Sequence, residues 1–280
     1  MKFKIITDST CDLPKDLLEA YDITLTPLTV IKADEAFKDG VTITPADIFT
    51  HVASGGALCS TSAVSVGEYQ DMFALYAKDY DGILHVSLGS GFSASYQNAS
   101  LAAEEFDNVQ VVDSKNLTVG QGFLALKAVE LAKTAQSLDA LAQEVAAFAE
   151  TVEASFVVDK LDYLVKGGRC SSAAALGANL LNLKPCIEVK DNKMTVVKKY
   201  RGNFAKCLTS YVRDRLEGRE DVDRRTVFII QTSVPEDAHK ATREAVETYG
   251  RFENVLENKA GCTISCHCGP GTLGIIFVRK

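Results

Sequence analysis

Short apolar runs alternate with amphipathic segments along the first half of the chain. The β-branched and apolar composition predicts strands at KFKIIT (2–7), ITLTPLTVI (23–31), GILHVSL (82–88) and VQVVD (109–113). Helical patterns separate these runs, and the capping box Ser65-x-x-Glu68 marks the start of one helix. Two more helices are expected between about residues 118 and 151. This alternation predicts a parallel sheet with helices on both faces.

The second half has a different pattern. Strands are predicted at ASFVVD (154–159), CIEVK (186–190), KMTVVKKY (193–200) and RTVFIIQT (225–232), with Asp191-Asn192 as a hairpin turn. Helices are expected over 171–181, from Asn203 onward and over 235–249. This order favours a mixed sheet with helices on one side. We therefore expect two domains, 1–150 and 151–280.

Composition narrows the class of protein. The chain is 46% hydrophobic and 24% charged, which is typical of a globular protein with a sizeable core. The net charge of −7 disfavours general nucleic-acid binding. No apolar run approaches the ~20 residues that span a bilayer, and the N-terminus predicts a strand rather than a signal peptide. Eight irregularly spaced cysteines then favour reduced thiols in a cytoplasmic protein.

The most distinctive run, CTISCHCGPG, covers residues 262–271 and suggests a metal site at first sight. Its β-branched composition predicts a strand, in which successive side chains point to opposite faces. Cys262, Cys266 and Cys268 would then share the core face, and His267 would lie on the polar face. Cys-x-Cys also lacks the spacing of zinc sites. We expect no metal here, and a lone histidine before a tight turn.

Three hydroxyl-rich loops follow predicted strands and precede predicted helices, at residues 7–10, 59–65 and 89–95. Ligands of open parallel sheets bind outside the carboxyl ends of the strands, and helix N-termini suit anions. Helix capping explains any one of these loops. Three such loops on one sheet edge favour an anion site.

The third loop also matches a dinucleotide fingerprint. Gly89-x-Gly91-x-x-Ala94 follows a strand and opens a helix, and Asp113 ends the next strand, 22 residues after Gly91. This spacing is close to that of the ribose-binding acid in such enzymes. A dinucleotide-binding enzyme is therefore one alternative function.

A serine hydrolase is a weaker alternative. Ser93 would be the nucleophile and His267 the base, with Asp8 or Asp113 as the orienting acid. The segment Gly91-Phe-Ser-Ala-Ser departs from the nucleophile elbow G-x-S-x-G in its last position.

A short Lys-Gly-Gly-Arg segment ends at Arg169 and leaves two explanations open. It forms either a helix C-cap with basic residues on the helix dipole, or an anion contact through Arg169.

Together these segments resemble one family over essentially the whole chain. The matching segments, in order, are TDS (7–9) with DL (12–13), TSAVS (61–65), SGFSASYQNA (90–99), VVDS (111–114), LDYLVKGGR (161–169), KYRG (199–202) and HCGPGTLG (267–274). The chain resembles DegV proteins, the bacterial fatty-acid-binding proteins that present acyl chains to a separate fatty acid kinase.

The resemblance implies an α/β/α three-layer N-terminal domain with a parallel sheet and a two-layer α/β C-terminal domain with a mixed sheet. It implies a long-chain fatty acid between the two domains, with its carboxylate on Thr61, Ser93 and His267. Weaker candidates for the same role are Ser62, Ser95 and Arg169. The chain departs from the family's usual pattern at Ala63-Val64, where Gln-Pro is common, and at Ala94-Ser95, where Gly-Thr is common.

The same resemblance implies a lipid carrier rather than an enzyme, with no cofactor. No G-x-x-x-x-G-K-[ST] loop is present, so ATP binding and acyl-phosphate formation are expected of the kinase partner. We expect Arg201 to contact that kinase. No nucleic-acid partner is expected, and at most transient membrane contact.

Overall fold

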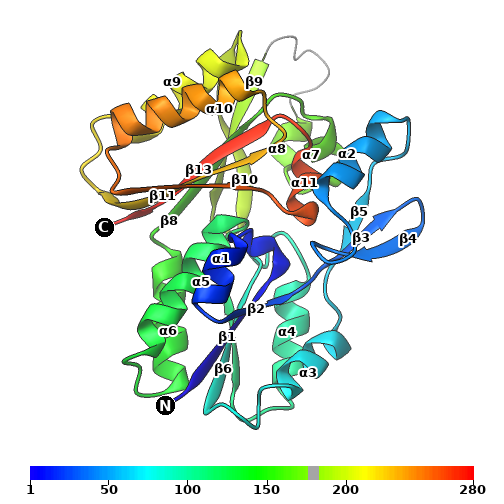
Figure 1. The fold of residues 1–280 in the computed structure, drawn as a ribbon, viewed down its shortest axis with the longest axis vertical. Helices are drawn as coiled ribbons and strands as arrows, with labels where there is room; N and C mark the ends of the chain where they lie inside the picture. The colour runs from blue at the N-terminus through cyan, green and yellow to red at the C-terminus, as the bar shows by residue number, and fades with distance from the viewer. Residues whose placement is uncertain (176–182) are drawn as a thin grey trace. The chain divides into compact units, whose positions relative to one another are not determined.

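The computed structural model describes residues 1–175 and 183–280, and the chain divides into two compact units (Figure 1). Unit 1 comprises Met1–Thr44, Thr61–Thr151 and Gly261–Thr263; unit 2 comprises Pro45–Ser60, Val152–Ala260 and Ile264–Lys280. A single boundary near residue 150 would place residues 45–60 in the first unit and residues 261–263 in the second. The observed division instead places residues 45–60 in unit 2 and residues 261–263 in unit 1.

The sheet of unit 1 has the strand order β2-β1-β6-β7, and all of its strands are parallel. The strands are β1 (Phe3–Asp8), β2 (Ile23–Thr26), β6 (Gly82–Ser87) and β7 (Val109–Asp113). Every residue of β6 is buried, as expected for a central strand covered on both faces. The predicted parallel sheet is confirmed. Thr7 of β1 pairs with Val86 of β6, so the loops after these strands begin at the same edge.

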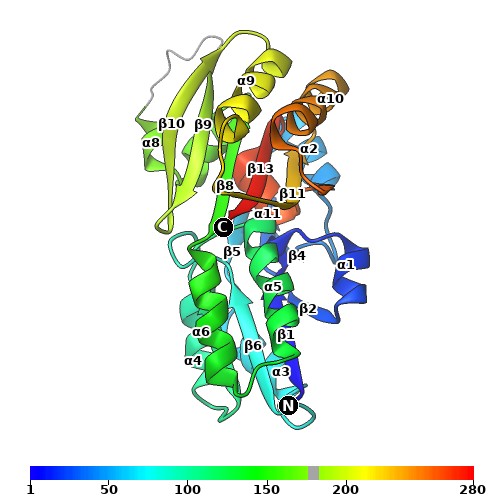
Figure 2. The same ribbon diagram turned by 90° about the vertical axis from the view of Figure 1, so that its left-hand side faces the viewer.

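Helices cover both faces of this sheet (Figures 1 and 2). On one face lie α3 (Val66–Ala74) and α4 (Ser95–Ala103); on the other lie α5 (Val119–Ala132) and α6 (Leu138–Ala149). The predicted capping box is present, because the Ser65 hydroxyl accepts from the Glu68 amide and Glu68 accepts from the Ser65 amide. The 3-10 turn η1 (Ser9–Cys11) and α1 (Lys15–Ala20) connect β1 to β2.

The single strand predicted over 23–31 is wrong. Pro27 has no N–H to donate to a ladder, and it separates β2 from β3 (Thr29–Lys32), which lies in a different sheet. β3 pairs with β4 (Glu35–Lys38) through a two-residue turn with positive φ at Ala33 and Asp34. With β5 (Ser60–Ser62) they form a three-stranded sheet of order β4-β3-β5.

Unit 2 contains a mixed six-stranded sheet of order β10-β9-β8-β13-β11-β12, in which only β11 and β12 pair in parallel. Its strands are β8 (Val152–Val158), β9 (Leu183–Lys190), β10 (Lys193–Arg201), β11 (Val222–Thr232), β12 (Asn254–Lys259) and β13 (Thr272–Arg279). The predicted hairpin is confirmed, with Asp191 and Asn192 in the left-handed region.

Two helices, α9 (Phe204–Leu216) and α10 (Glu236–Ala245), pack side by side on this sheet, and the π-helical turn η2 (Val246–Gly250) extends α10 (Figure 2). Tyr211 of α9 is fully buried in their shared core. Its hydroxyl donates to the Ser155 carbonyl (2.6 Å) and accepts from the Ile275 amide (3.0 Å), so the polar end of this core residue is satisfied.

Four short helices complete unit 2: α2 (Pro45–Ala53), α7 (Asp162–Gly167), α8 (Ser171–Ala174) and α11 (Cys262–Cys268), whose first residues belong to unit 1. The helix predicted over 171–181 is present as α8, and its part from residue 176 onward lies outside the described residues.

The strand predicted for CTISCHC is wrong, because the run forms the helix α11. Its first turn is stabilised by Asp39, which lies 223 residues from Cys262 in sequence and is invisible to local composition. The alternation argument therefore fails: Cys262 and Cys266 share a helix face, as do Thr263 and His267. All eight cysteines of the chain are buried thiols.

Across residues 1–175 and 183–280, no three His, Cys, Asp or Glu side chains are placed to share a metal ion. Within the same ranges, every helix is too short or too polar to span a bilayer.

Candidate functional site

Two of the three hydroxyl-rich loops leave the parallel sheet of unit 1 at the carboxyl ends of neighbouring strands. Residues 7–10 span the end of β1 and the turn after it, and residues 89–95 follow β6. The third, residues 59–65, contains β5 and does not follow a strand of this sheet, although it does precede α3. The expectation of three loops on one sheet edge is therefore wrong for this loop.

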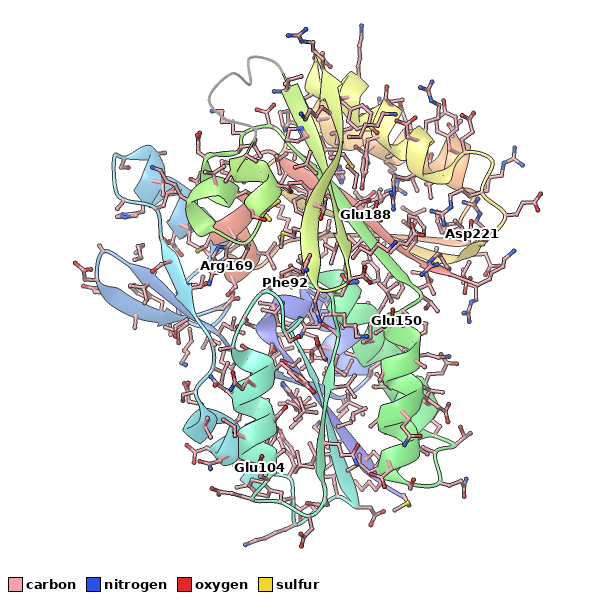
Figure 3. All side chains as sticks on the ribbon, turned by 180° about the vertical axis from the view of Figure 1, so that it is seen from behind. Phe92, Glu104, Glu150, Arg169, Glu188 and Asp221 are labelled. Carbon is pink, nitrogen blue, oxygen red and sulfur yellow. The ribbon has the colours of Figure 1, made fainter. Side chains whose placement is uncertain are left out.

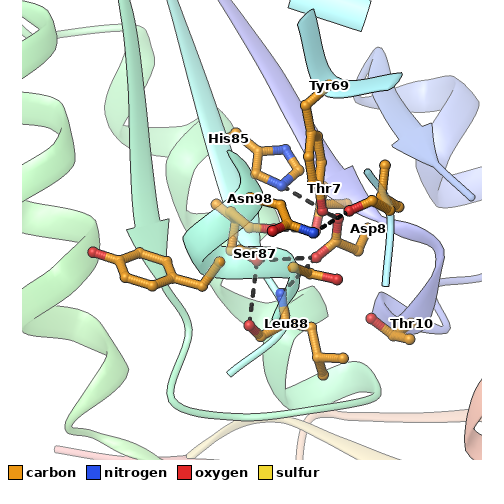
Figure 4. A network of polar contacts seen from close by, with 12 residues as sticks. Thr7, Asp8, Thr10, Tyr69, His85, Ser87, Leu88 and Asn98 are labelled. Carbon is orange, nitrogen blue, oxygen red and sulfur yellow. Dashed lines mark hydrogen bonds and ion pairs between the residues drawn. The ribbon is translucent and has the colours of Figure 1, made fainter. Parts of the chain in front are cut away.

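Asp8, at the end of β1, is the centre of a buried polar network (Figure 4). Its Oδ1 accepts from the Tyr69 hydroxyl at 2.6 Å, and its Oδ2 accepts from the Leu88 amide at 2.7 Å and the Ser87 hydroxyl at 3.1 Å. The Nε2 of His85 lies 3.3 Å from Oδ1. Burial and the Asp8 charge raise the pKa of Tyr69 well above its usual value, so Tyr69 stays a proton donor.

Ser93 lies at the end of the loop after β6, immediately before α4, and is half-buried. Its Oγ accepts from the Ser95 amide (3.1 Å) and lies 3.0 Å from the Ser95 Oγ. Ser95 is fully buried. Of these two candidates, Ser93 is therefore the more accessible, and the Ser95 amide holds its hydroxyl in place.

Thr61 and Ser62 lie on β5, where Thr61 is half-buried and Ser62 is exposed. The Ser62 hydroxyl donates weakly to the neighbouring Ala63 carbonyl (3.3 Å). Asn98 of α4 donates to the Val64 carbonyl (2.7 Å) and so fastens the Thr61 segment to the helix that follows Ser93. This hydrogen bond links the segment after Thr61 to α4, and Figure 4 shows the Asn98 side chain that donates it.

In unit 2, His267 is half-buried in the last turn of α11. A Cβ on Gly167 would come within 2.6 Å of the His267 Nδ1, so only glycine leaves room for the imidazole here. Burial, and secondarily the charge of Arg169, lower the pKa of His267 to about 4. The imidazole is therefore neutral at neutral pH and carries one N–H.

The two candidate arginines of unit 2 are both exposed. Arg169 follows α7, and its Nη1 donates to the Gly167 carbonyl at 2.7 Å (Figure 3). Gly168 has φ +70° and is the left-handed C-cap of α7, so the helix C-cap is confirmed, and the anion contact of Arg169 stays a prediction. Arg201 ends β10, the edge strand of the sheet.

Two carboxylates of unit 1 hold the start of α11. Asp39 accepts from the amides of Cys262 (2.8 Å) and Thr263 (3.1 Å), and Asp12 accepts from the Gly261 amide (2.8 Å). Burial is the main reason that the pKa of Asp12 is raised to about 8.

The geometry argues against the two enzymatic alternatives. Asp113 uses Oδ1 to accept from the Ser90 amide (3.0 Å) and Oδ2 to accept from the Ser90 hydroxyl (2.6 Å), so this acid holds the loop after β6. Asp8, the other predicted orienting acid, accepts from Tyr69, Ser87 and Leu88 inside unit 1.

Sequence reasoning missed Tyr69, Asn98 and the role of Gly167. The capping box had fixed where α3 begins, and this places Tyr69 in the second turn of that helix. Its contact with Asp8 depends on tertiary packing, however, which no local signal reveals. The candidate residues fall into two sets: Thr61, Ser62, Ser93 and Ser95 in unit 1, and Arg169, Arg201 and His267 in unit 2.

Comparison with known proteins gives one consistent result. A family model described as an uncharacterised protein of the DegV family matches residues 2–280. Protein DegV of Bacillus subtilis is 32% identical over 287 residues, which is 100% of both chains. The structure is similar to that of a fatty-acid-binding DegV family protein from Thermus thermophilus (TM-score 0.90, 30% identity, 100% of both chains). It is also similar to a stearic acid-binding protein from Eubacterium ventriosum (TM-score 0.83, 28% identity, 99% of this chain and 98% of that one).

Proposed function

This chain belongs to the DegV family, and from that premise we propose that it binds one long-chain fatty acid and presents the carboxylate to a separate fatty acid kinase. The observation that carries the proposal is the half-buried Ser93, held by Ser95 at the start of α4, in a fold shared with fatty-acid-binding relatives. The two units correspond, in this proposal, to the two domains of a lipid carrier.

The proposed head-group donors are the hydroxyls of Thr61 and Ser93 and the imidazole of His267. A buried carboxylate must be hydrogen-bonded, and these three groups supply neutral donors. A neutral His267 donates one N–H without adding a charge that would hold the head group tightly. Ser62 and Arg169 are exposed and are secondary candidates for the same carboxylate.

Burial of the acyl chain would supply most of the affinity. A chain of ~16 carbons gains at most ~12 kcal/mol, at ~0.8 kcal/mol for each methylene removed from water. Association and ordering of the flexible chain offset several kcal/mol of that gain. A head group held by neutral donors then stays reactive, which suits a ligand that another protein must phosphorylate.

Phosphoryl transfer is assigned to the partner. The sequence contains no P-loop motif, so the carrier supplies the carboxylate oxygen that attacks the terminal phosphate of ATP on the kinase, giving acyl-phosphate and ADP. We propose exposed Arg201, on the edge strand β10, as a kinase contact. The carrier would act in the cytoplasm, without a cofactor of its own and with at most transient membrane contact.

Native mass spectrometry of the protein expressed in bacteria tests the proposal. We expect a co-purifying mass equal to that of a long-chain fatty acid, and exchange of that ligand for an added isotope-labelled fatty acid. A ligand-free mass with no uptake of added fatty acid would show that the proposal is wrong.

A kinase assay tests the second half. With a bacterial fatty acid kinase and ATP, the loaded protein should yield acyl-phosphate, which hydroxylamine traps as the hydroxamate. Arg201→Ala should slow this reaction and leave fatty-acid affinity unchanged. An unchanged rate would remove Arg201 from the contact, and an absence of hydroxamate with the unaltered protein would remove the kinase step.

A further inference from the structure

The first residues of the loop that carries Ser93 are hydrogen-bonded to a segment that begins at the last residue of β7. This cradle segment comprises residues 113–116. The Ser114 amide donates to the Ser87 carbonyl (3.2 Å), and the Gly89 amide donates to the Asn116 carbonyl (2.9 Å). These bonds extend the β6–β7 pairing beyond the ends of the two strands. The backbone that leads into Ser90 is therefore held by the cradle segment.

The Asp113 carboxylate adds two charge-assisted hydrogen bonds to this loop. Its two oxygens accept from the amide (3.0 Å) and the hydroxyl (2.6 Å) of Ser90, a bidentate arrangement that fixes both position and orientation. Oδ1 also accepts from the Lys115 amide (2.9 Å), and Lys115 has the unfavourable φ of +51°. Asp113 thus stabilises the left-handed conformation of Lys115 in the cradle segment. The same carboxylate also holds the Ser93 loop through Ser90.

From Ser90 the loop reaches Ser93 within one turn. The Phe92 amide donates to the Gly89 carbonyl (2.9 Å), and Phe92 is buried. The next residue is Ser93, whose Oγ is held by the Ser95 amide at the start of α4. A shift of Ser90 would therefore move Ser93 relative to α4.

We propose that Asp113 is a positioning residue that acts on the fatty-acid head group through Ser90 and Ser93. This rests on the proposed function, and specifically on Ser93 as a donor to the carboxylate. In this proposal the two Asp113 carboxylate oxygens hold Ser90. In a dinucleotide-binding enzyme the same oxygens would bind the ribose hydroxyls. The role depends on hydrogen-bond geometry and not on charge.

The measurement is the ratio of the dissociation constants for hexadecan-1-ol and palmitate, which isolates the head group because both tails are alike. Ser93→Ala should lower this ratio at least about fivefold. Asp113→Ala and Ser90→Ala should each lower it about threefold to tenfold. Asp113→Asn should leave it near the unaltered value, because an amide can accept from the Ser90 amide and donate to the Ser90 hydroxyl.

Two controls separate positioning from general loosening. Gln110→Ala removes another side-chain hydrogen bond from β7, the one between Gln110 and Asp139, and should not change the ratio. In a double-mutant cycle, Asp113→Ala should have no further effect on the ratio when Ser93 is already alanine. Additive losses would show that Asp113 does not act through Ser93.

The possible failures are distinguishable. If Ser93→Ala lowers the ratio but Asp113→Ala does not, the positioning role is wrong and the proposed function stands. If Asp113→Asn is as defective as Asp113→Ala, charge matters rather than geometry and the inference fails. If Ser93→Ala itself leaves the ratio unchanged, the head-group assignment fails, and with it the premise of this inference.

Discussion

The buried carboxylates Asp12 and Asp39 of unit 1 and the half-buried Glu153 of unit 2 accept hydrogen bonds from different kinds of donor. In unit 1, Asp39 accepts from the amides of Cys262 and Thr263, and Asp12 accepts from the Thr118 hydroxyl (2.6 Å) and a backbone amide. Hydroxyls and peptide groups are neutral dipoles, and at Asp12 they leave the burial of the carboxyl largely uncompensated. The pKa of Asp12 is accordingly raised to about 8.

In unit 2, Glu153 lies among arginines. It accepts from Arg215 and Arg219 at 2.8 Å, and Arg279 lies 3.3 Å away. Burial opposes ionisation here too, but the guanidinium groups outweigh it and lower the pKa of Glu153. Glu188 and Asp221 extend this ion-pair cluster (Figure 3).

The difference indicates how unit 1 would hold a foreign carboxylate. Its loops supply hydroxyls, amides and helix starts, which orient an acid without a fixed cation. The carboxylate of a fatty acid bound through Thr61 and Ser93 would accept from neutral donors, as Asp39 does, and not from guanidinium groups, as Glu153 does. Its binding should depend little on salt, since the donors carry no net charge.

Removal of neutral donors gives the largest expected effect. Ser93→Ala and His267→Ala should each weaken palmitate binding by about 1–3 kcal/mol, because a buried acceptor loses its donor. Arg169→Ala should cost less than about 0.5 kcal/mol, since exposed charges contribute little. Displacement titrations at low and high salt measure all three. A larger loss of affinity from Arg169→Ala than from Ser93→Ala or His267→Ala would contradict the conclusion that neutral donors bind the carboxylate.

Replacement of Asp12 tests the cost of burial in unit 1. A folded pKa of about 8 means that the folded state keeps a proton that the unfolded state has lost above pH ~4. Stability should therefore fall by about 1 kcal/mol per pH unit between about pH 4 and 8, and this decline should flatten in Asp12→Asn. Urea unfolding at several pH values measures it. Parallel curves for the two proteins would contradict the assignment.

Replacement of Glu153 should give the opposite pH dependence in unit 2. Because the folded pKa is lowered, the ion pairs stabilise the protein above pH ~4.5 and lose their effect as pH falls through the folded pKa. Glu153→Gln should cost about 1 kcal/mol at pH 7, and the difference from the unaltered protein should shrink below pH 4.5. The same urea series measures this. A difference that grows toward acid pH would reverse the sign.

An effect no larger than that of Glu153→Gln is expected from a change in the packing around His267. Gly167→Ala places a Cβ against the imidazole and should weaken palmitate binding by about 1 kcal/mol. Gly168→Ala is the matched control: its φ of +70° makes it destabilising, but its Cβ would meet nothing within 4 Å. If both variants bind palmitate equally well, Gly167 does not position His267.

The strands and most helices could be predicted because their signals are local. Alternating runs, the capping box at Ser65 and the Asp191-Asn192 turn each depend on a few neighbouring residues. The helix α11 could not be predicted in this way, because its β-branched composition favours a strand and its cap comes from the distant Asp39. Local composition also gave a wrong prediction around Pro27. The apolar run there was predicted to form one strand, but it forms β2 and β3, which belong to different sheets.

The candidate site was predictable to a similar extent. Ser93 stood out because serine before a predicted helix is a local pattern. The assignment of Asp113 to a ribose followed from spacing alone. Its contact with Ser90 depends on the pairing of β6 with β7, which places the ends of two strands side by side. Such a contact becomes visible only once the strand order is known.

The burial of every cysteine gives this protein an internal reporter. A thiol reacts with alkylating agents as the thiolate, and burial raises the pKa of Cys11 and Cys262 and takes that of Cys186 to about 12. The intact fold is therefore nearly inert to such reagents. Each labelled cysteine, located by mass, would record which part of the chain had opened and for how long, with no engineered probe.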